Sequence, residues 1–431
     1  MNDSLLSMCK RDTITNLPYF DDFCHICDEL IQMAKKDYYL VAFDIANFKL
    51  INDNYGFAMG DVLLNKAIEK FCMEDEECIV ATRIYSDHIV ALYSRINEHE
   101  LIPEKVTRLN AEFVKDNQLN FPLVPLHIHA GVYSLGGRVE HITVCVDKAN
   151  MARKAAKGHY KIDCVEYSDV LMKQQVRVAE ILTTLEENIR NNQVLIYLQP
   201  KINVEKQRVV GAEALTRLID KNGKIISPDE FIPVLEKTGK VIDLDKYVMK
   251  NVVKLVYKWS RLGIKDIRVS INMSKVHFYL EDIADQIIAN FKELDLSPSL
   301  IEFEVTESVF LKDTDMIIEK IKKLRDFGFK ISIDDFGSGY SSLNLISILP
   351  VDTVKLDKRF IETSLNTKRG KEIMKGLITM LNEINLGIVC EGIETAEEEK
   401  VIYEYGCSEV QGFLYDKPIR IDEFEKKYLN L

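Results

Sequence analysis

No run of apolar residues in this sequence approaches the ~20 residues that a helix needs to cross a bilayer. The N-terminal stretch MNDSLLSMCKRDTITN is polar and has no signal-peptide core. Positive charge is outnumbered as well, because 56 Lys and Arg face 68 Asp and Glu, for a net charge of −12. An acidic chain is a poor binder of nucleic-acid backbones. We therefore expect a cytoplasmic protein that binds neither DNA, RNA nor membranes, and whose anionic ligands would need metal ions or a few well-placed cations.

The nine cysteines are scattered and odd in number, so they form no disulfide framework. Cys24 and Cys27 make a CxxC, within CHIC, but a zinc site would need a second close pair and the sequence has none. Buried thiols usually pack as small hydrophobes, which is the favoured interpretation here. The sequence therefore predicts reduced cysteines and no zinc site.

A length of 431 residues exceeds one ordinary core, so two domains are expected. In residues 1–168, apolar β-rich segments alternate with helical stretches. The predicted strands cover 38–45, 78–85, 88–94, 126–135 and 160–167, and the predicted helices lie near 20–35, 60–73, 99–116 and 143–157. The second and third strands are close enough to form a hairpin. The pattern predicts an α/β sandwich on a mixed sheet, followed by a connecting helix over 169–191, where apolar residues recur at helical spacing.

Residues 192–431 contain eight predicted strands, with helical stretches in the gaps from the second strand onward. The strands cover 194–200, 209–218, 267–273, 301–308, 330–336, 353–357, 387–393 and 410–415. This alternation predicts a TIM-type (β/α)8 barrel. Only the stretch INVEKQRV separates the first two strands, which is too short for a parallel crossover. We therefore predict that the first strand runs antiparallel to the second.

Polar side chains gather near the ends of the predicted barrel strands, where the active sites of TIM barrels form. They are Glu213, Arg217, Asn272, Glu304, Glu307, Asp334, Asp335, Lys355, Asp357, Glu391, Glu394 and Gln411. Converging carboxylates are costly unless a cation neutralises them. Oxygen ligands without a His or Cys cluster favour Mg²⁺ or Mn²⁺. Two such ions can clamp a phosphodiester and activate a water, and Lys355 could orient or deprotonate that water or neutralise the phosphate.

Seven ordered motifs carry a resemblance to a known family. They are EALTR (213–217), INMS (271–274), EVTES (304–308), DDFGSGYSSL (334–343), VKLD (354–357), CEGIET (390–395) and QGFLY (411–415). Over roughly 175–431 the chain resembles the EAL phosphodiesterases in motif order and spacing. The resemblance implies a TIM-like barrel with one antiparallel strand, two Mg²⁺ or Mn²⁺ ions, and hydrolysis of one phosphodiester of cyclic di-GMP to linear pGpG.

The resemblance also implies roles for individual residues. The implied metal ligands are Glu213, Asn272, Glu304 and Asp334 for the first ion and Asp335 for the second, with Glu391 supporting the metal shell. The implied catalytic residues are Lys355, Glu213, Asp335 and Glu391, and the implied substrate contacts are Gln199, Arg217 and Gln411. Glu394 corresponds to the residue that stabilises the loop 334–343. We expect that loop to be functional, because its glycines permit a close approach to a metal site.

The first half resembles the diguanylate cyclases of the GGDEF family in DTITNLPYF (12–20), in the stretch 43–64 and in DKANMARKAAKGH (147–159). The hairpin turn that would read GGDEF is instead Tyr85-Ser86-Asp87-His88-Ile89. Two glycines that permit positive φ and close approach to a triphosphate are gone, and His88 replaces a metal-binding Glu. Asp44 then remains as a lone carboxylate, so the sequence predicts a degenerate domain without cyclase activity.

Alternatives remain open for both halves. Asn52 and Asp61 match guanine-contacting positions of the GGDEF family, so the first half is expected either to bind GTP or to be a structural or dimerising module, and the second of these is favoured. By analogy with the family, a homodimer is expected. For the barrel, the alternatives are a cyclic di-GMP receptor without catalysis and another TIM-barrel metalloenzyme, for example of enolase type.

Overall fold

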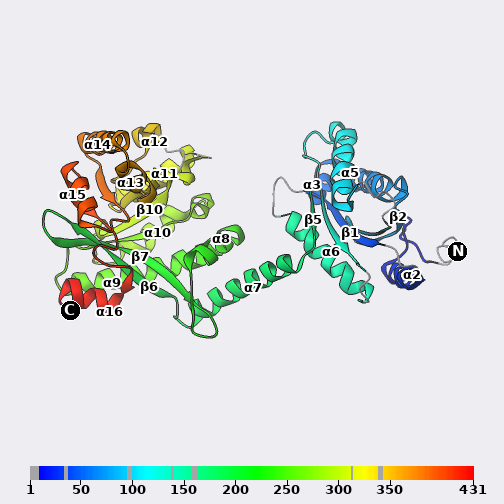
Figure 1. Cartoon of the computed structure of the whole chain (residues 1–431), viewed down its shortest axis with the longest axis horizontal. Coiled ribbons are helices and arrows are strands. Elements are labelled where there is room, and N and C mark those ends of the chain that lie inside the picture. Colours follow the sequence, from blue (N-terminus) through cyan, green and yellow to red (C-terminus); the bar gives the residue numbers. More distant parts are fainter. Residues whose placement is uncertain are drawn as a thin grey trace. The chain divides into compact units, whose positions relative to one another are not determined.

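The computed structural model describes residues 9–33, 37–94, 100–136, 140–157, 163–311, 314–337 and 343–431. The chain divides into two compact units, Met1–Arg177 and Val178–Leu431 (Figure 1). Across the described ranges, no helix has both the length and the apolar character required to cross a membrane.

The first unit is built on a five-stranded mixed sheet with the strand order β2-β3-β1-β4-β5. The strands are β1 (Tyr38–Ile45), β2 (Cys78–Tyr85), β3 (His88–Ser94), β4 (Ile128–Ser134) and β5 (Cys164–Glu166). Strand β1 runs antiparallel to β3 and β4, whereas β4 and β5 are parallel. Strands β2 and β3 form the predicted hairpin. The expected α/β fold on a mixed sheet is confirmed.

Helices cover both faces of this sheet because successive side chains of β1 point to opposite sides. Leu40 and Ala42 pack with α2 (Phe20–Met33) and α6 (Ile142–Ala156). Val41 and Phe43 pack with α3 (Phe48–Tyr55), α4 (Phe57–Ile68) and α5 (Ile102–Asn117). Cys27 is fully buried in the first of these two cores, and the nine cysteines, all within the described ranges, form no disulfide.

Helix α3 is absent from the sequence prediction. Asn52 and the two residues that follow it, Asp53 and Asn54, are weak helix formers, so local propensity gives little signal. The buried side chains of Phe48 and Ile51 hold the helix against the sheet. Tertiary packing therefore decides this element.

Helix α4 ends at Ile68 and continues as a π-helical turn, Glu69–Met73, so the predicted helix near 60–73 is two elements.

The stretch expected as a connecting helix is helix α7 (Asp169–Arg190). Its C-terminal half belongs to the second unit, where Ile181 and Leu185 are buried in the main core. The side chain of Asn188 donates to the carbonyl of Ile219 at 2.9 Å and accepts from the amide of the same residue at 2.9 Å. These two bonds fix the end of the helix to strand β7.

The second unit is a closed barrel of eight strands. They are β6 (Leu195–Asn203), β7 (Arg208–Ile219), β9 (Arg268–Asn272), β10 (Ile301–Thr306), β11 (Lys330–Phe336), β12 (Thr353–Leu356), β13 (Gly387–Cys390) and β14 (Glu409–Val410). Neighbours from β7 to β14 are parallel. Strand β6 is antiparallel to both β7 and β14 and so closes the barrel. The prediction of one reversed strand is confirmed, because the hairpin between β6 and β7 is too short for a crossover.

Helices surround the barrel in the gaps between its parallel strands (Figure 1). They are α8 (Pro228–Thr238), α9 (Val241–Arg261), α10 (Ile283–Lys292), α11 (Thr314–Phe327), α12 (Leu343–Ile348), α13 (Lys358–Leu365), α14 (Lys368–Glu383), α15 (Ala396–Glu404) and α16 (Ile421–Phe424). Two short strands, β8 (Ile225–Ile226) and β15 (Ile419–Arg420), pair with β7 and β6.

The last two barrel strands are shorter than the sequence predicts. Strand β13 ends at Cys390 and strand β14 at Val410, so Glu391, Glu394 and Gln411 lie beyond the strand ends. Gly412 packs so closely on the backbone of Ile393 that a Cβ atom would lie 2.0 Å from its carbonyl oxygen. Contact between these two loops therefore replaces strand pairing.

Candidate active site

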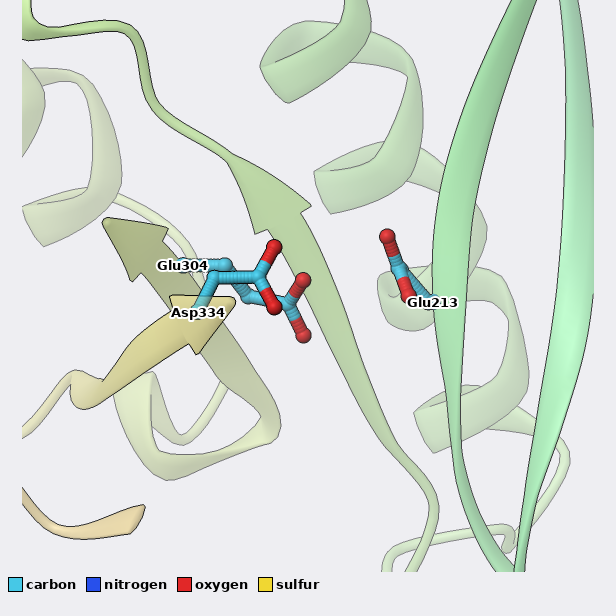
Figure 2. A group of neighbouring side chains, drawn as sticks. All are labelled: Glu213, Glu304 and Asp334. Atoms are coloured by element: carbon cyan, nitrogen blue, oxygen red, sulfur yellow. The ribbon is translucent and has the colours of Figure 1, made fainter. Parts of the chain in front are cut away.

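Three buried carboxylates converge inside the barrel at the C-terminal ends of its strands. Glu213 comes from β7, Glu304 from β10 and Asp334 from β11, and their side-chain oxygens lie within 4.8 Å of one another. Figure 2 shows Glu213 facing Glu304 and Asp334 across a common space. All three are more than nine-tenths buried. The sequence placed these residues at successive strand ends, and the structure brings them together.

A second group of carboxylates shares Asp334 with the first. Oxygens of Asp334, Asp335 and Glu391 also lie within 4.8 Å of one another. Consecutive residues of a regular strand point to opposite faces. Asp335, however, has a φ of 56°, and the pairing of β11 with β12 shifts register between Ile333 and Phe336. This local break explains how two adjacent aspartates reach the same site.

The ammonium group of Lys355 lies between the carboxylates of both acidic groups. The side chain is fully buried, and its Nζ lies 2.6 Å from Glu304 Oε2, 2.6 Å from Glu391 Oε1 and 2.8 Å from Asp334 Oδ1. Glu213 Oε2 is 3.3 Å away. Burial disfavours the ammonium, but the surrounding carboxylates outweigh it and raise the pKa of Lys355 well above its usual value. Lys355 is therefore a fixed positive charge in this site.

The carboxylates of the two acidic groups nevertheless outnumber the lysines that contact them. Burial, together with Glu304, raises the pKa of Glu213. The pKa of Glu391 is raised well above its usual value by burial and by Asp334, although Lys355 opposes this. For Glu304 burial acts in the same direction, but the ammonium groups of Lys201 and Lys355 prevail and lower its pKa to about 2. Five carboxylates thus share two lysines, which is an arrangement that favours bound cations.

The donor set fits divalent ions that prefer oxygen. Asp334 Oδ1 is buried and has no hydrogen bond of good direction within the described residues, even though Lys355 is close. Asn272 donates to Glu213 Oε1 at 3.0 Å, and its amide oxygen makes no hydrogen bond in the described part of the chain. Carboxylate and amide oxygens suit Mg²⁺ or Mn²⁺. The residues present are therefore suited to holding such ions.

Two glutamines stand beside Glu213. Gln411 donates to Glu213 Oε2 at 2.7 Å and to Gln199 Oε1 at 3.1 Å. The side-chain oxygen Oε1 of Gln411 is buried without a hydrogen-bond partner among the described residues. Both glutamines line a hollow of about 290 Å³ that also contains Lys358 and Phe413. A second hollow, of about 690 Å³, lies on the side of Asn272, Glu304 and Asp335. Known ligand pockets have similar volumes.

Four residues from the sequence prediction lie outside the carboxylate groups. Arg217 is half-buried, donates to the carbonyl of Thr216 at 2.7 Å and stacks over the ring of Tyr197. Glu394 forms an ion pair with Lys358. Asp357 caps helix α13 by accepting from the amide of Arg359, and Glu307 lines the larger hollow. Residues 338–342 of the predicted functional loop lie outside the described residues, so its contact with Glu394 stays a prediction.

Lys201 is a site residue that the sequence prediction missed. It is buried, with Nζ 2.8 Å from Glu304 Oε1 and 3.7 Å from Glu302 Oε2. A signal was present, because Lys201 follows Gln199 by two residues and therefore faces the same side of β6. A lysine on the inner face of a barrel strand needs a buried partner. Here that partner is the carboxylate of Glu304.

Asp44, expected from the sequence to be a lone carboxylate, is surrounded by cationic and imidazole side chains. Asp44 is buried, and Arg153, which is also buried, forms an ion pair with it. His129 Nδ1 lies 3.2 Å from Asp44 Oδ1 and His88 Nε2 lies 3.4 Å from Oδ2. Burial opposes ionisation, but His129, His88 and Arg153 together lower the pKa of Asp44 below its usual range. These three side chains therefore compensate the negative charge of Asp44.

The other residues of the degenerate motif shape this turn. Ser86 adopts a φ of 51° although it is not glycine, and its carbonyl accepts from Arg83 Nε at 2.6 Å. Asp87 accepts from the amide of Ile45 at 3.0 Å. Tyr85 is exposed and packs on the ring of His88, whereas Ile89 is buried in the core. The turn thus has a positive φ at Ser86 without a glycine there.

We expect Arg153→Met to lower the free energy of unfolding of the first unit by about 3 kcal/mol at pH 7, because it removes the buried guanidinium that pairs with the buried carboxylate of Asp44. The pKa of Asp44 is depressed in the folded state, so its contribution to stability is present above the pKa of the unfolded state and is lost as pH falls. The loss caused by the substitution should therefore shrink at acid pH. The chain has one tryptophan, Trp259, which lies in the second unit.

Urea unfolding of the full chain can measure the change in the free energy of unfolding caused by Arg153→Met. Circular dichroism reports on both units, and Trp259 fluorescence reports on the barrel alone. The substitution should shift the dichroism transition and leave the fluorescence transition in place. Lys157→Met, which removes an exposed cation 3.9 Å from Asp44, is the matched control and should have a smaller effect. Equal shifts from both variants would contradict the assigned role of Arg153.

Comparisons with known proteins agree with both halves of this description. The family model "EAL domain" matches residues 182–418, which is more than half of the chain. The model "Diguanylate cyclase, GGDEF domain" matches residues 9–161. The chain is 30% identical over 430 residues to the signaling protein YkoW of Bacillus subtilis, and this covers 97% of the chain and 53% of YkoW. It is 28% identical over 443 residues to the cyclic di-GMP phosphodiesterase PdeR of Escherichia coli, covering 99% of the chain and 64% of PdeR.

Solved structures are similar to the barrel. The complex of the PaMucR phosphodiesterase with c-di-GMP has a TM-score of 0.53 and 30% identity, and it covers 57% of this chain and 99% of that one. An EAL domain protein from Listeria monocytogenes has a TM-score of 0.52 and 26% identity, covering 58% and 98%. The chain spans between about half and two thirds of the length of the full-length relatives it matches. With the motifs, the barrel and the matched domain models in agreement, the chain belongs to the EAL domain family and carries a GGDEF domain before its EAL domain in sequence.

Proposed function

We propose that this chain is a metal-dependent phosphodiesterase that hydrolyses one phosphodiester bond of cyclic di-GMP and releases linear pGpG. The observation that carries the proposal is the pair of acidic groups that share Asp334 around the buried Lys355. The names of MucR and PdeR, and the solved complex of PaMucR with c-di-GMP, support the choice of substrate. The residue types at the site match what two-ion phosphodiester hydrolysis needs.

In this proposal the first ion is held by Glu213, Asn272, Glu304 and Asp334. The second ion is held by Asp335, Asp334 and Glu391. Bound ions of this kind stabilise charge on the phosphate and generate a nucleophilic water. The geometric support is that each set of three carboxylates already lies within coordinating reach of one point.

The proposed role of Lys355 follows from its charge. Lys355 orients the attacking water and neutralises phosphate charge, because its Nζ lies 2.6 Å from Glu391 and 2.8 Å from Asp334, beside both proposed metal sites. Lys201 keeps Glu304 ionised from the opposite side. Gln199 and Gln411 contact the substrate from the hollow beside Glu213, and Arg217 binds a phosphate. Glu394 stabilises the loop that follows Asp335.

For the first unit we propose a regulatory or structural role without cyclase activity. The ion pair between the buried Arg153 and Asp44 supports this proposal, because an arginine already compensates the charge of that carboxylate. Asn52 has a buried Oδ1 without a hydrogen-bond partner in the described chain, which leaves an acceptor for guanine in a GTP-binding domain. The proposed domains are 1–168 and 192–431, joined by the helix over 169–191. A cytoplasmic homodimer completes the proposal.

Incubation of the full chain with cyclic di-GMP and Mg²⁺ or Mn²⁺, followed by chromatography of the nucleotides, tests the main proposal. We expect pGpG to appear with metal and to be absent with EDTA. The same protein incubated with GTP should form no cyclic di-GMP. Tight binding of cyclic di-GMP without product would support a receptor instead, and neither binding nor product with either metal would contradict the proposed substrate.

A further inference from the structure

A separate hollow of about 570 Å³ lies outside the barrel, between helices α9 and α10. Met249 and Val253 of α9 form one wall, and Ile287 and Phe291 of α10 form the other. The outward-facing side chain of Phe303 on β10 belongs to its floor. Its volume falls within the range of small-molecule pockets, and apolar atoms dominate its surface. The two helices therefore leave part of the barrel's outer face open to a ligand.

The edge of this hollow carries positive charge. Lys246, Lys250 and Lys254 line it at intervals of four residues, so they form one row along α9. All three are exposed, and none has an ion pair or hydrogen bond within the described chain. On the facing helix, Gln286 and Asn290 are exposed and neutral. Three unpaired cations in one row are unusual on a chain with a net charge of −12.

Asp245 is the acidic residue that lines the hollow. Asp245 Oδ2 lies 2.9 Å from His277 Nε2 and accepts from the amide of Ser274 at 3.3 Å. Within the described chain it forms no ion pair with Lys246, Lys250 or Lys254. His277 is 3% exposed, and its Nδ1 is buried without a partner among the described residues. Buried polar groups normally have a partner, so an unpaired nitrogen in the lining indicates that the hollow takes up a ligand or water.

We propose that this hollow binds a single-chain anionic amphiphile, with its hydrocarbon chain between α9 and α10 and its anionic head at the lysine row. Apolar walls stabilise the chain by removing its surface from water. The lysines favour a carboxylate or phosphate head over a neutral or cationic one. Asn272, a proposed metal ligand, also lines the hollow, but the lysine row and the apolar walls belong to neither acidic group, so the inference holds whether or not the proposed hydrolysis is correct.

Calorimetric titration of the full chain with sodium dodecanoate, below the concentration at which it forms micelles, tests this binding. We expect saturable binding of one molecule per chain. Dodecyltrimethylammonium has the same chain length and the opposite charge, and it should bind at least tenfold more weakly. Acetate, which has the head without the chain, should give no heat of binding. Equal affinity for the two amphiphiles, heat that never saturates, or no binding of dodecanoate would overturn the proposal.

Two variants locate the site. Lys250→Glu should weaken dodecanoate binding by about fivefold, the effect of one exposed charge pair, whereas Lys375→Glu, an exposed lysine of α14 outside the hollow, should leave it unchanged. Val253→Trp fills the hollow and should abolish binding while the urea unfolding transition measured by circular dichroism is retained. If that variant unfolds early, Met249→Trp replaces it. Unchanged binding in a folded cavity-filled variant would place the amphiphile elsewhere and refute the assignment.

Discussion

Asp334→Asn is expected to lower the rate of cyclic di-GMP hydrolysis by about three orders of magnitude or more, equivalent to about 4 kcal/mol in the activation barrier. Asp334 is the carboxylate that both acidic groups share, so one substitution weakens both proposed metal sites. Asparagine has nearly the same shape, and the barrel should remain folded. The measurement is the initial rate of pGpG formation at saturating Mg²⁺ or Mn²⁺, with the unfolding transition recorded in parallel.

Asp357→Asn is the matched control for this experiment. Asp357 follows the next barrel strand and caps helix α13, and it belongs to neither acidic group. Asparagine is also a good N-cap, so the cap should persist. We expect a rate within a few-fold of the unsubstituted chain. A rate for Asp334→Asn within tenfold of that control would exclude Asp334 as a shared metal ligand.

Lys355→Met is expected to have the second large effect, on both turnover and stability. Removing the ammonium leaves Glu304, Glu391 and Asp334 buried without their central cation. Breaking a buried ion pair in this way costs about 3–5 kcal/mol. Turnover should fall by orders of magnitude because the water and the phosphate lose their positively charged contact. Urea unfolding monitored by Trp259 fluorescence in EDTA, together with the pGpG assay, measures both.

Divalent metal separates the two effects of this substitution. Metal ions that bind only the folded barrel stabilise it by mass action. Adding Mn²⁺ should therefore recover much of the stability of Lys355→Met without recovering turnover. Lys358→Met serves as the stability control, because Lys358 pairs with Glu394 at an exposed position and such pairs contribute about 1 kcal/mol or less. Full turnover in Lys355→Met would rule out its proposed contact with the water and phosphate.

The antiparallel direction of strand β6 could be predicted from local sequence information. The short connection between β6 and β7 excludes a parallel crossover, so the length of that connection alone predicted the reversed direction of the first strand. Glu213, Glu304 and Asp334 were likewise predicted from their positions at strand ends, because all parallel strands of a barrel present those ends at one rim. Helix α3 was missed, because buried contacts rather than helix propensity stabilise it.

The sequence by itself determined the two-domain order, the barrel with its reversed strand, and the residue types available for oxygen-ligand chemistry. Only the tertiary structure decided how those residues share charge. The left-handed backbone at Asp335 and the register shift beside it turn two adjacent carboxylates toward one site. The fold pairs Lys201 with Glu304 and Arg153 with Asp44, although the two partners of each pair are far apart in the sequence. Charge partners far apart in the chain meet only in the fold, and their energies depend on burial, which no local pattern encodes.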